Sequence, residues 1–166
     1  IHIPFLGFEA ERVAPFYDTR WYEDVDLLIA SDYDFQRYAK EPDRYREFVS
    51  YYHSLHTSWR NVLTLKPSDE RTGPTFWFYV YPDSAKTTPL DPALFARVEG
   101  SPESSRVSNF LKDLNTVFLR KGKLQKSKQV LEEILTVEVE NVPLRNMLAQ
   151  VLVNMGNYDA ALVHLQ

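Results

Sequence analysis

Asp32 and Asp34 are the residues of this sequence whose type and position most suggest chemistry. They lie in the stretch IASDYDFQRY, where we expect a short buried strand to end and a helix to begin, a position at which ligands and catalytic groups collect in open α/β sheets. A hydrolytic pair needs carboxylates that converge at about 5–10 Å, whereas residues two apart on a helix point about 200° away from each other. We therefore expect Ser31 or Asp32 to cap the helix and both aspartates to stabilise its first turn.

A hydrolase that acts through the acidic residues between 18 and 34 is the weaker hypothesis, and we expect no catalytic residue in this chain. Serine-hydrolase and phosphate-loop patterns are absent from the sequence. We expect the chain to require no cofactor.

His53 and His56 are three residues apart on an expected helix, a spacing that can hold zinc. A third ligand would be needed, the order His-Glu-x-x-His is absent, and the chain has no cysteine. Because His56 shares the apolar side of the helix with Tyr52 and Trp59, we expect a histidine packed among aromatic rings and no metal site.

Two charged clusters allow a binding role. Acidic residues surround Trp21 and Tyr22, which favours either contact with a sugar or an acidic surface turn anchored by aromatic rings; these acids are Asp18, Glu23, Asp24 and Asp26. Basic residues gather further along the chain, where they could meet anionic lipid headgroups or be ordinary solvated side chains; they are Arg120, Lys121, Lys123, Lys126 and Lys128.

Composition indicates a soluble globular protein of two modules. The 166 residues are 44% hydrophobic and 25% charged, and no apolar run approaches the roughly 18 residues of a membrane helix. The net charge of −4 argues against nucleic acid as a partner. Aromatic residues concentrate before position 82 and become sparse beyond it. We predict one module over residues 1–82, a Pro-rich linker over 83–104 and a second module over 105–166.

The first module is predicted to be a small, aromatic-rich α/β layer domain, so the whole chain is a mixed α+β protein. The expected elements are a strand near Ile1–Phe5, a strand over Val25–Ala30, a helix after Ser31, a helix of about 16 residues that begins near Pro42, and strands over Asn61–Leu65 and Thr75–Tyr81. The order of the strands in the sheet is not readable from the sequence.

The second module contains an internal repeat. Residues 108–141 align with 142–166 so that Leu114 falls on Leu148 and Gly122 on Gly156. Apolar stripes at helical spacing flank each glycine, which is expected to end the first helix of each pair and to let the chain reverse. The pattern and its period resemble the tetratricopeptide repeat, a unit of two antiparallel helices. Two positions depart from the pattern: Arg145 stands where a large apolar residue is expected, and Val139 stands where a proline is usual.

That resemblance implies that the first helix of each unit lines a concave groove for an extended peptide or protein partner. Carried over by position, the partner-binding residues are Asn109, Lys112, Thr116, Leu119 and Arg120, then Asn146, Gln150, Val153 and Asn154. This set is polar and mildly basic. It is not the set that clamps a peptide carboxylate, because Thr116 and Met147 stand where asparagines would be needed. A solvated helix face is the alternative.

An ordered series of motifs in the first module carries a second resemblance. The motifs read LLIASDYDFQRYAKEPDRY, FVSYYHSLHTSW and RTGPTFWFYVYP, and APFYDTRWYED precedes them. Together they resemble the extracytoplasmic tail of membrane glycosyltransferases that use lipid-linked sugars, the protein-mannosyltransferase-like GT-C class. The catalytic carboxylate of that class lies in a loop between membrane helices, so the resemblance implies an accessory domain on the extracytoplasmic, periplasmic side of a bacterial membrane.

We therefore expect a non-catalytic piece of a longer membrane protein, whose repeats bind a partner protein and whose membrane tether lies outside this sequence. The alternative is a stand-alone repeat-bearing adaptor with no link to an enzyme.

Overall fold

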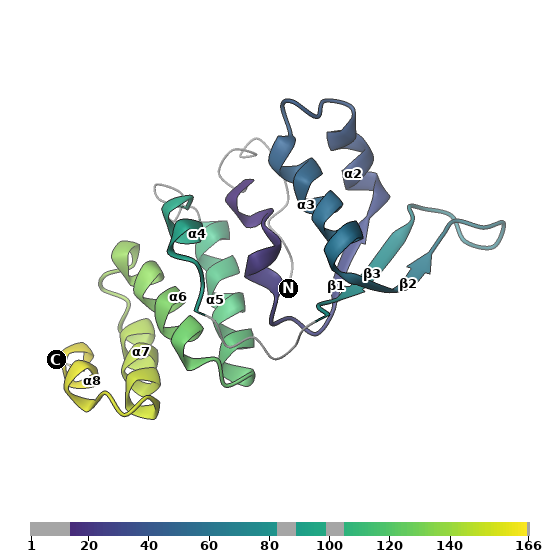
Figure 1. The fold of residues 1–166 in the computed structure, drawn as a ribbon. Coiled ribbons are helices and arrows are strands. Elements are labelled where there is room, and N and C mark those ends of the chain that lie inside the picture. The colour runs from purple at the N-terminus through teal and green to yellow at the C-terminus, as the bar shows by residue number, and fades with distance from the viewer. Residues whose placement is uncertain (1–13, 83–88, 99–104, 166) are drawn as a thin grey trace. The chain divides into compact units, whose positions relative to one another are not determined.

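The computed structural model describes residues 14–82, 89–98 and 105–165, and the chain divides into two compact units. We call residues 14–82 the α/β unit and residues 89–98 with 105–165 the helical unit. The described residues combine helices with one three-stranded antiparallel sheet, which confirms the expected mixed α+β class (Figure 1).

The sheet of the α/β unit consists of β1 (Leu28–Ser31), β2 (Arg60–Leu65) and β3 (Phe76–Val80) in the order β1-β3-β2. All three were expected from runs of β-forming residues. The first strand was predicted over Val25–Ala30. It is observed over Leu28–Ser31, so it begins later and is shorter than predicted. The strand expected near Ile1–Phe5 falls outside the described residues.

The register of the sheet separates its two faces. Leu28 pairs with Tyr79, and both side chains are buried, whereas the next row joins Ile29, Phe78 and Leu63. Successive residues of a strand point to opposite faces, so the second row lies on the other face, where Ile29 and Leu63 are about half exposed. Figure 1 shows α2 (Asp32–Ala39) and α3 (Arg46–Ser58) together on one side of the sheet.

The prediction that α3 begins near Pro42 was wrong. Glu41 accepts hydrogen bonds from the backbone amides of Arg44 and Tyr45, so residues 41–45 form turns, and the helix starts at Arg46 with 13 residues instead of about 16. Proline fixes the backbone for a first helical turn, but it fits the turns found here equally well.

An aromatic core joins α3 to two short 3-10 helices, η1 (Ala14–Phe16) and η2 (Thr19–Tyr22). Tyr17 lies between them, with its ring 4.4 Å from that of Phe48 and 5.2 Å from that of Tyr51. Tyr38 stacks on Phe48 at 4.6 Å, and burial raises the pKa of its hydroxyl to about 12. Such pairs contribute about 0.5–1.5 kcal/mol beyond the area that they bury. Most of the buried side chains of this unit are therefore aromatic, and Leu28 and Leu55 are buried with them.

The helical unit contains α5 (Ser105–Arg120), α6 (Leu124–Val137), α7 (Val142–Asn154) and α8 (Tyr158–His164). Each helix packs on the next, α5 on α6, α6 on α7 and α7 on α8 (Figure 1). Leu111, Leu114 and Phe118 of α5 and Leu148 of α7 are buried, as expected from their helical spacing.

The segment predicted as a linker, 83–104, contains a short helix, α4 (Pro92–Ala96), in its described part. Asp91 caps this helix by accepting a hydrogen bond from Ala93, and Leu94 and Val98 are buried. The side chain of Gln129 on α6 bonds both the amide and the carbonyl of Leu90, at 3.0 and 3.2 Å. Residues 89–98 therefore belong to the helical unit and are not a free spacer.

The turns α5–α6 and α7–α8 have the same hydrogen bonds at corresponding positions of the internal repeat. Lys123 donates to the carbonyl of Phe118, and Asn157 donates to that of Leu152. Gly122 (φ +66°) and Gly156 (φ +78°) precede these donors in the left-handed region, which glycine adopts without the steric penalty of a side chain. The expectation that each glycine ends its helix is confirmed.

Candidate functional site

The residues expected to bind a partner lie on two helices. Asn109, Lys112, Thr116, Leu119 and Arg120 belong to α5, and Asn146, Gln150, Val153 and Asn154 belong to α7. We call these nine residues the α5–α7 face. Lys112 and Leu119 are partly buried, and the other seven are exposed. The buried Asn115 of α5 donates to the sulfur of Met147 on α7 at 2.9 Å, so the two helices that carry the face are neighbours.

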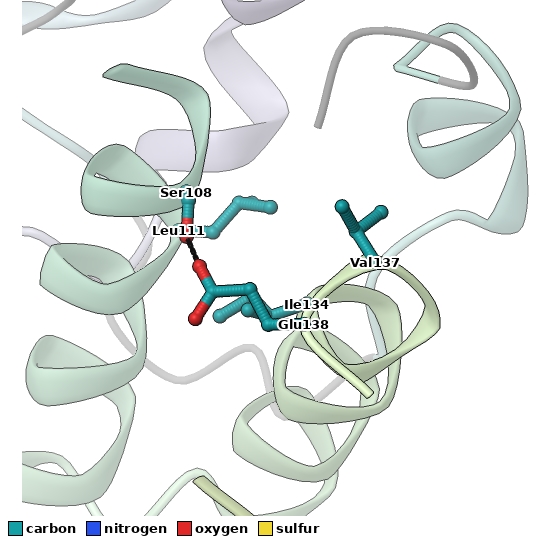
Figure 2. A pocket seen from close by; sticks show the side chains of 5 residues that line it. All are labelled: Ser108, Leu111, Ile134, Val137 and Glu138. Atoms are coloured by element: carbon teal, nitrogen blue, oxygen red, sulfur yellow. Dashed lines mark hydrogen bonds between the residues drawn. The ribbon is translucent and has the colours of Figure 1, made fainter. Parts of the chain in front are cut away.

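Lys112 is engaged within the protein. Its Nζ lies 2.8 Å and 3.0 Å from the two carboxylate oxygens of Glu138, which follows α6. Glu138 also accepts hydrogen bonds from Ser108, drawn in Figure 2, and from Asn141 at 2.7 Å. The bonds from Lys112 and then Ser108 lower the pKa of the Glu138 carboxyl, which therefore stays ionised at neutral pH.

This network links three helices. Ser108 and Lys112 come from α5, Glu138 caps the end of α6, and Asn141 caps the start of α7 by accepting a hydrogen bond from Leu144 at 3.1 Å. Sequence reasoning missed Glu138, because it lies outside the positions that the repeat assigns to the groove.

The positive charge of the face is reduced, but not removed, by a neighbouring carboxylate. Glu138 neutralises Lys112, and the part of α7 from Asn146 to Asn154 carries no charged residue. On α5 the exposed Arg120 is matched in number by the exposed Asp113. The nine residues of the face include two cations, Lys112 and Arg120, and Glu138 offsets one of them, so the face keeps a positive charge.

A hollow lies beside the network and is lined by Ser108, Leu111, Ile134, Val137 and Glu138 (Figure 2). It leaves no room for a ligand. This hollow is therefore not a candidate ligand pocket.

Asp32 and Asp34 have separate structural partners. Asp32 accepts a hydrogen bond from the amide of Thr75 at 3.0 Å, and its own amide donates to the Thr75 carbonyl. Asp34 accepts from the hydroxyl of Ser31 at 3.2 Å. Both lie in the first turn of α2, as expected, and Ser31 is its N-cap residue, although no side chain makes a capping bond to the backbone. The bond of Asp32 to Thr75 was not foreseen.

The acidic and aromatic residues 18–26 do not offer a sugar-stacking surface. Trp21 is 0% and Tyr22 1% exposed, and each donates a hydrogen bond to a backbone carbonyl, those of Pro15 and Phe16 respectively. The carboxylate of Asp18 forms an ion pair with the guanidinium of Arg20, with a nitrogen–oxygen distance of 2.8 Å. Because a sugar can stack only on an exposed ring, these observations favour the alternative, an acidic turn anchored by buried rings.

His56 packs among aromatic rings, as expected. Its ring lies 4.8 Å from that of Trp77, and its Nδ1 is 2.6 Å from the hydroxyl of Tyr79. Burial, and secondarily the nearby His53, lower the pKa of His56. Among the described residues, no group of three or more His, Cys, Asp or Glu side chains could hold a metal ion.

The basic residues between 120 and 128 do not form one patch. Lys126, which we expected to be solvated, is 3% exposed, and its Nζ lies 5.7 Å from the centre of the Phe118 ring. Lys128 pairs with Glu132 at 2.9 Å on the same helix. A headgroup would meet a smaller and more divided positive surface than the sequence indicates.

Comparisons with protein-family models, with curated proteins and with solved structures find no match for this chain. Within the described part of the chain, no helix is both long enough and apolar enough to cross a membrane.

Proposed function

We propose that the helical unit is a protein-interaction module of the tetratricopeptide type. The observation that carries the proposal is that the helix boundaries recur at the offset of the sequence repeat. The last residues of α5 and α7, the first residues of α6 and α8, and the left-handed glycines of the two turns are all related by this one offset. Ser127 and Ala161 occupy corresponding positions and are both buried and small, which lets the two helices of each pair approach closely.

The α5–α7 face is the proposed binding surface for a partner protein or peptide. Seven of its nine residues are exposed, and its side chains come from the first helix of each pair, which is where a repeat of this type presents its ligand surface. The adjoining network of Glu138, Ser108 and Asn141 holds α5 and α7 in register, so the face is preorganised. Preorganisation reduces the entropy lost when a partner binds.

We propose that the α/β unit is the accessory, extracytoplasmic tail of a membrane glycosyltransferase-like protein. The support is the ordered motif series, whose residues contact one another: Asp32 of the first motif bonds Thr75 of the last, and the rings of Tyr38 and Tyr45 within the first motif are 5.3 Å apart. In this account the unit positions the helical unit outside the membrane and performs no transfer reaction.

The natural reading frame around this sequence tests the membrane part of the proposal. Several apolar segments of about 20 residues each would support a membrane transferase-like parent. A frame without such segments would contradict it and would favour the stand-alone adaptor.

Peptide selection tests the binding part. A displayed library of random 12-residue peptides is selected on the protein, and the affinity of the enriched peptides is then measured on two variants. Gln150→Arg places a long cation in the α5–α7 face, and Gln125→Arg makes the same change at an exposed position of α6 outside the face. We expect Gln150→Arg to weaken binding by about tenfold or more, and Gln125→Arg to leave it unchanged. Equal effects of the two variants would contradict the proposal.

A further inference from the structure

We propose that Met147 is a site of reversible oxidation to the sulfoxide, and that this oxidation breaks a hydrogen-bonded link between α5 and α7. The proposal follows from a relay of three side chains, Ser127, Asn115 and Met147, which joins buried positions of α6 and α5 to a partly exposed sulfur on α7. It does not rest on the proposed binding function, because it concerns how the helices are held together and needs no partner.

The relay begins in the core of the helical unit. The hydroxyl of Ser127 on α6 donates to Oδ1 of Asn115 on α5 at 2.6 Å, and Nδ2 of Asn115 donates to the sulfur of Met147 on α7 at 2.9 Å. Ser127 is 0% and Asn115 3% exposed, so the amide is shielded from water. A buried donor that loses its partner carries the full cost of its lost hydration. The Asn115 amide therefore depends on the sulfur of Met147.

The sulfur at the other end of the relay belongs to a side chain that solvent reaches. Met147 is 38% exposed, and the chain has no cysteine whose thiol would compete for a peroxide. Hydrogen peroxide oxidises a thioether by transferring one oxygen. A lone pair of the sulfur forms the S–O bond, the O–O bond breaks, and the second oxygen leaves as water. The sulfur loses two electrons and the peroxide gains them.

The hydrogen bond from Asn115 determines which lone pair of the sulfur reacts. A thioether sulfur has two lone pairs, and attack through one or the other gives the two epimers of the sulfoxide. One lone pair of Met147 accepts the N–H of Asn115, so the oxidant meets the other and a single epimer forms. In that product the sulfur carries partial positive charge and no longer accepts a hydrogen bond. The buried amide of Asn115 is then left without its partner on α7.

Met155 is the matched control, because its exposure is the same while its sulfur lacks such a contact. The chain has two methionines, and each is 38% exposed. Met155 follows the last residue of α7, and among the described residues no donor bonds its sulfur. Neither lone pair of Met155 is engaged, so we expect both epimers to form there.

Peroxide treatment of two single-methionine proteins tests the stereochemistry. Met155→Leu retains Met147 alone, and Met147→Leu retains Met155 alone. Each folded protein is oxidised with hydrogen peroxide and digested. Mass spectrometry then measures how much sulfoxide each of two reductases removes, since each enzyme reduces one epimer. We expect an excess of one epimer of about tenfold or more at Met147, because attack on the engaged lone pair must first break the bond from Asn115.

Three controls should each remove this excess and leave the two epimers within about twofold of each other. The first is Met155 in the Met147→Leu protein. The second is Met147 in Met155→Leu protein that is oxidised after unfolding in urea, which abolishes the contact with Asn115. The third adds Asn115→Leu to Met155→Leu, which removes the donor from the folded protein. Far-UV circular dichroism verifies folding, and the urea control does not depend on it.

The melting temperature, followed by far-UV circular dichroism, tests the loss of the link. Oxidised Met155→Leu protein should melt about 5–10 °C below the unoxidised protein, because the buried Asn115 donor has lost its acceptor. Oxidised Met147→Leu protein should shift by less than about 2 °C. The reductase that acts on the epimer formed at Met147 should restore the original melting temperature.

Two kinds of result would overturn the proposal. Equal epimers at Met147 in the folded protein, or the same excess after unfolding or in the Asn115→Leu variant, would show that Asn115 does not direct the oxidant. An unchanged melting temperature of the oxidised Met155→Leu protein would show that the link between α5 and α7 is insensitive to oxidation. Neither result bears on peptide binding, so this proposal and the proposed function fail separately.

Discussion

The two units differ in how they use their polar side chains. In the α/β unit, the residues that looked most reactive have structural partners: Asp32 bonds Thr75, Asp34 bonds Ser31, and His56 contacts Tyr79. In the helical unit, Asn146 and Asn154 lie exposed in a row on a helix whose other side is buried. Residue types that suggest reactivity can therefore have purely structural partners, while the exposed amides lie on the face that we propose as the binding surface.

Trp21→Ala should have the largest effect on stability and should separate the two units. Trp21 is fully buried and bonded to Pro15, so its loss should cost about 3–5 kcal/mol. Trp59 and Trp77, the remaining tryptophans, also belong to the α/β unit, so their fluorescence during urea unfolding reports on that unit.

The matched change in the helical unit is Leu148→Ala, which should shift the unfolding transition seen by far-UV circular dichroism by about 2–5 kcal/mol. It should leave the tryptophan transition in place. If either substitution shifts the fluorescence transition and the circular dichroism transition equally, the two units do not unfold independently.

Gly122→Ala and Gly156→Ala should each destabilise the helical unit by about 1–2 kcal/mol, because alanine is strained in the left-handed region. No atom lies within 4 Å of a Cβ added at either position, so the cost arises from the backbone and not from a clash. Gly122→Asn should cost less, because asparagine tolerates this conformation. Urea unfolding followed by circular dichroism measures all three, and equal stability of wild type and Gly122→Ala would argue against the turn geometry.

The α/β unit should lose a little stability as the pH falls below about 6.5. Burial lowers the pKa of His56 from its usual 6.5, so the unfolded chain takes up a proton more readily than the folded one. The contribution of neutral His56 to stability is therefore fully present above its pKa in the unfolded chain. It is lost as the pH falls through its lower pKa in the folded protein. Because His56 is also exposed to solvent, which screens its charge, we expect a loss of less than about 1 kcal/mol.

His56→Gln is the matched variant for this prediction, because the glutamine side chain can accept a hydrogen bond from the Tyr79 hydroxyl and does not titrate. The urea midpoint from tryptophan fluorescence should fall between pH 7.5 and 5.5 in wild type by more than in the variant. Identical pH profiles would show that His56 does not couple to folding.

The smallest expected effect concerns Glu138. The pKa of Glu138 in the folded protein is lowered below the usual 4.5. Its contribution to stability is therefore fully present above 4.5 and is lost as the pH falls through the pKa of the folded state. Because the pair with Lys112 is partly exposed, we expect less than about 1 kcal/mol. Circular dichroism unfolding of wild type and Glu138→Gln at pH 6 and pH 3.5 should show the two converging at the lower pH.

Local patterns predicted the elements, because they depend on neighbours in the sequence. The aromatic run before Val80 specified β3, the helical stripes specified α5 to α7, and the offset of the internal repeat placed Gly122 and Gly156 in the turns. Pro42 misled the prediction of α3, since a proline suits a turn as well as a helix start.

Partners distant in the sequence could not be predicted. Asp32 meets Thr75 after 43 residues and Lys112 meets Glu138 after 26, and both contacts exist because the folded chain brings their elements together. Lys126 was expected on the surface because of its charge, yet it is buried with its ammonium near Phe118. Its long apolar stem can pack in a core while the charge meets a ring.

The most direct test of the central claim is an NMR titration of the ¹⁵N-labelled protein with the tightest peptide from the library selection. We expect the side-chain amide signals of Asn146, Gln150 and Asn154, and the backbone amides of α5 and α7, to shift together while those of the α/β unit do not. Shifts that cluster instead around Asp32, Asp34 and α2 would contradict it and would return the search for function to the α/β unit.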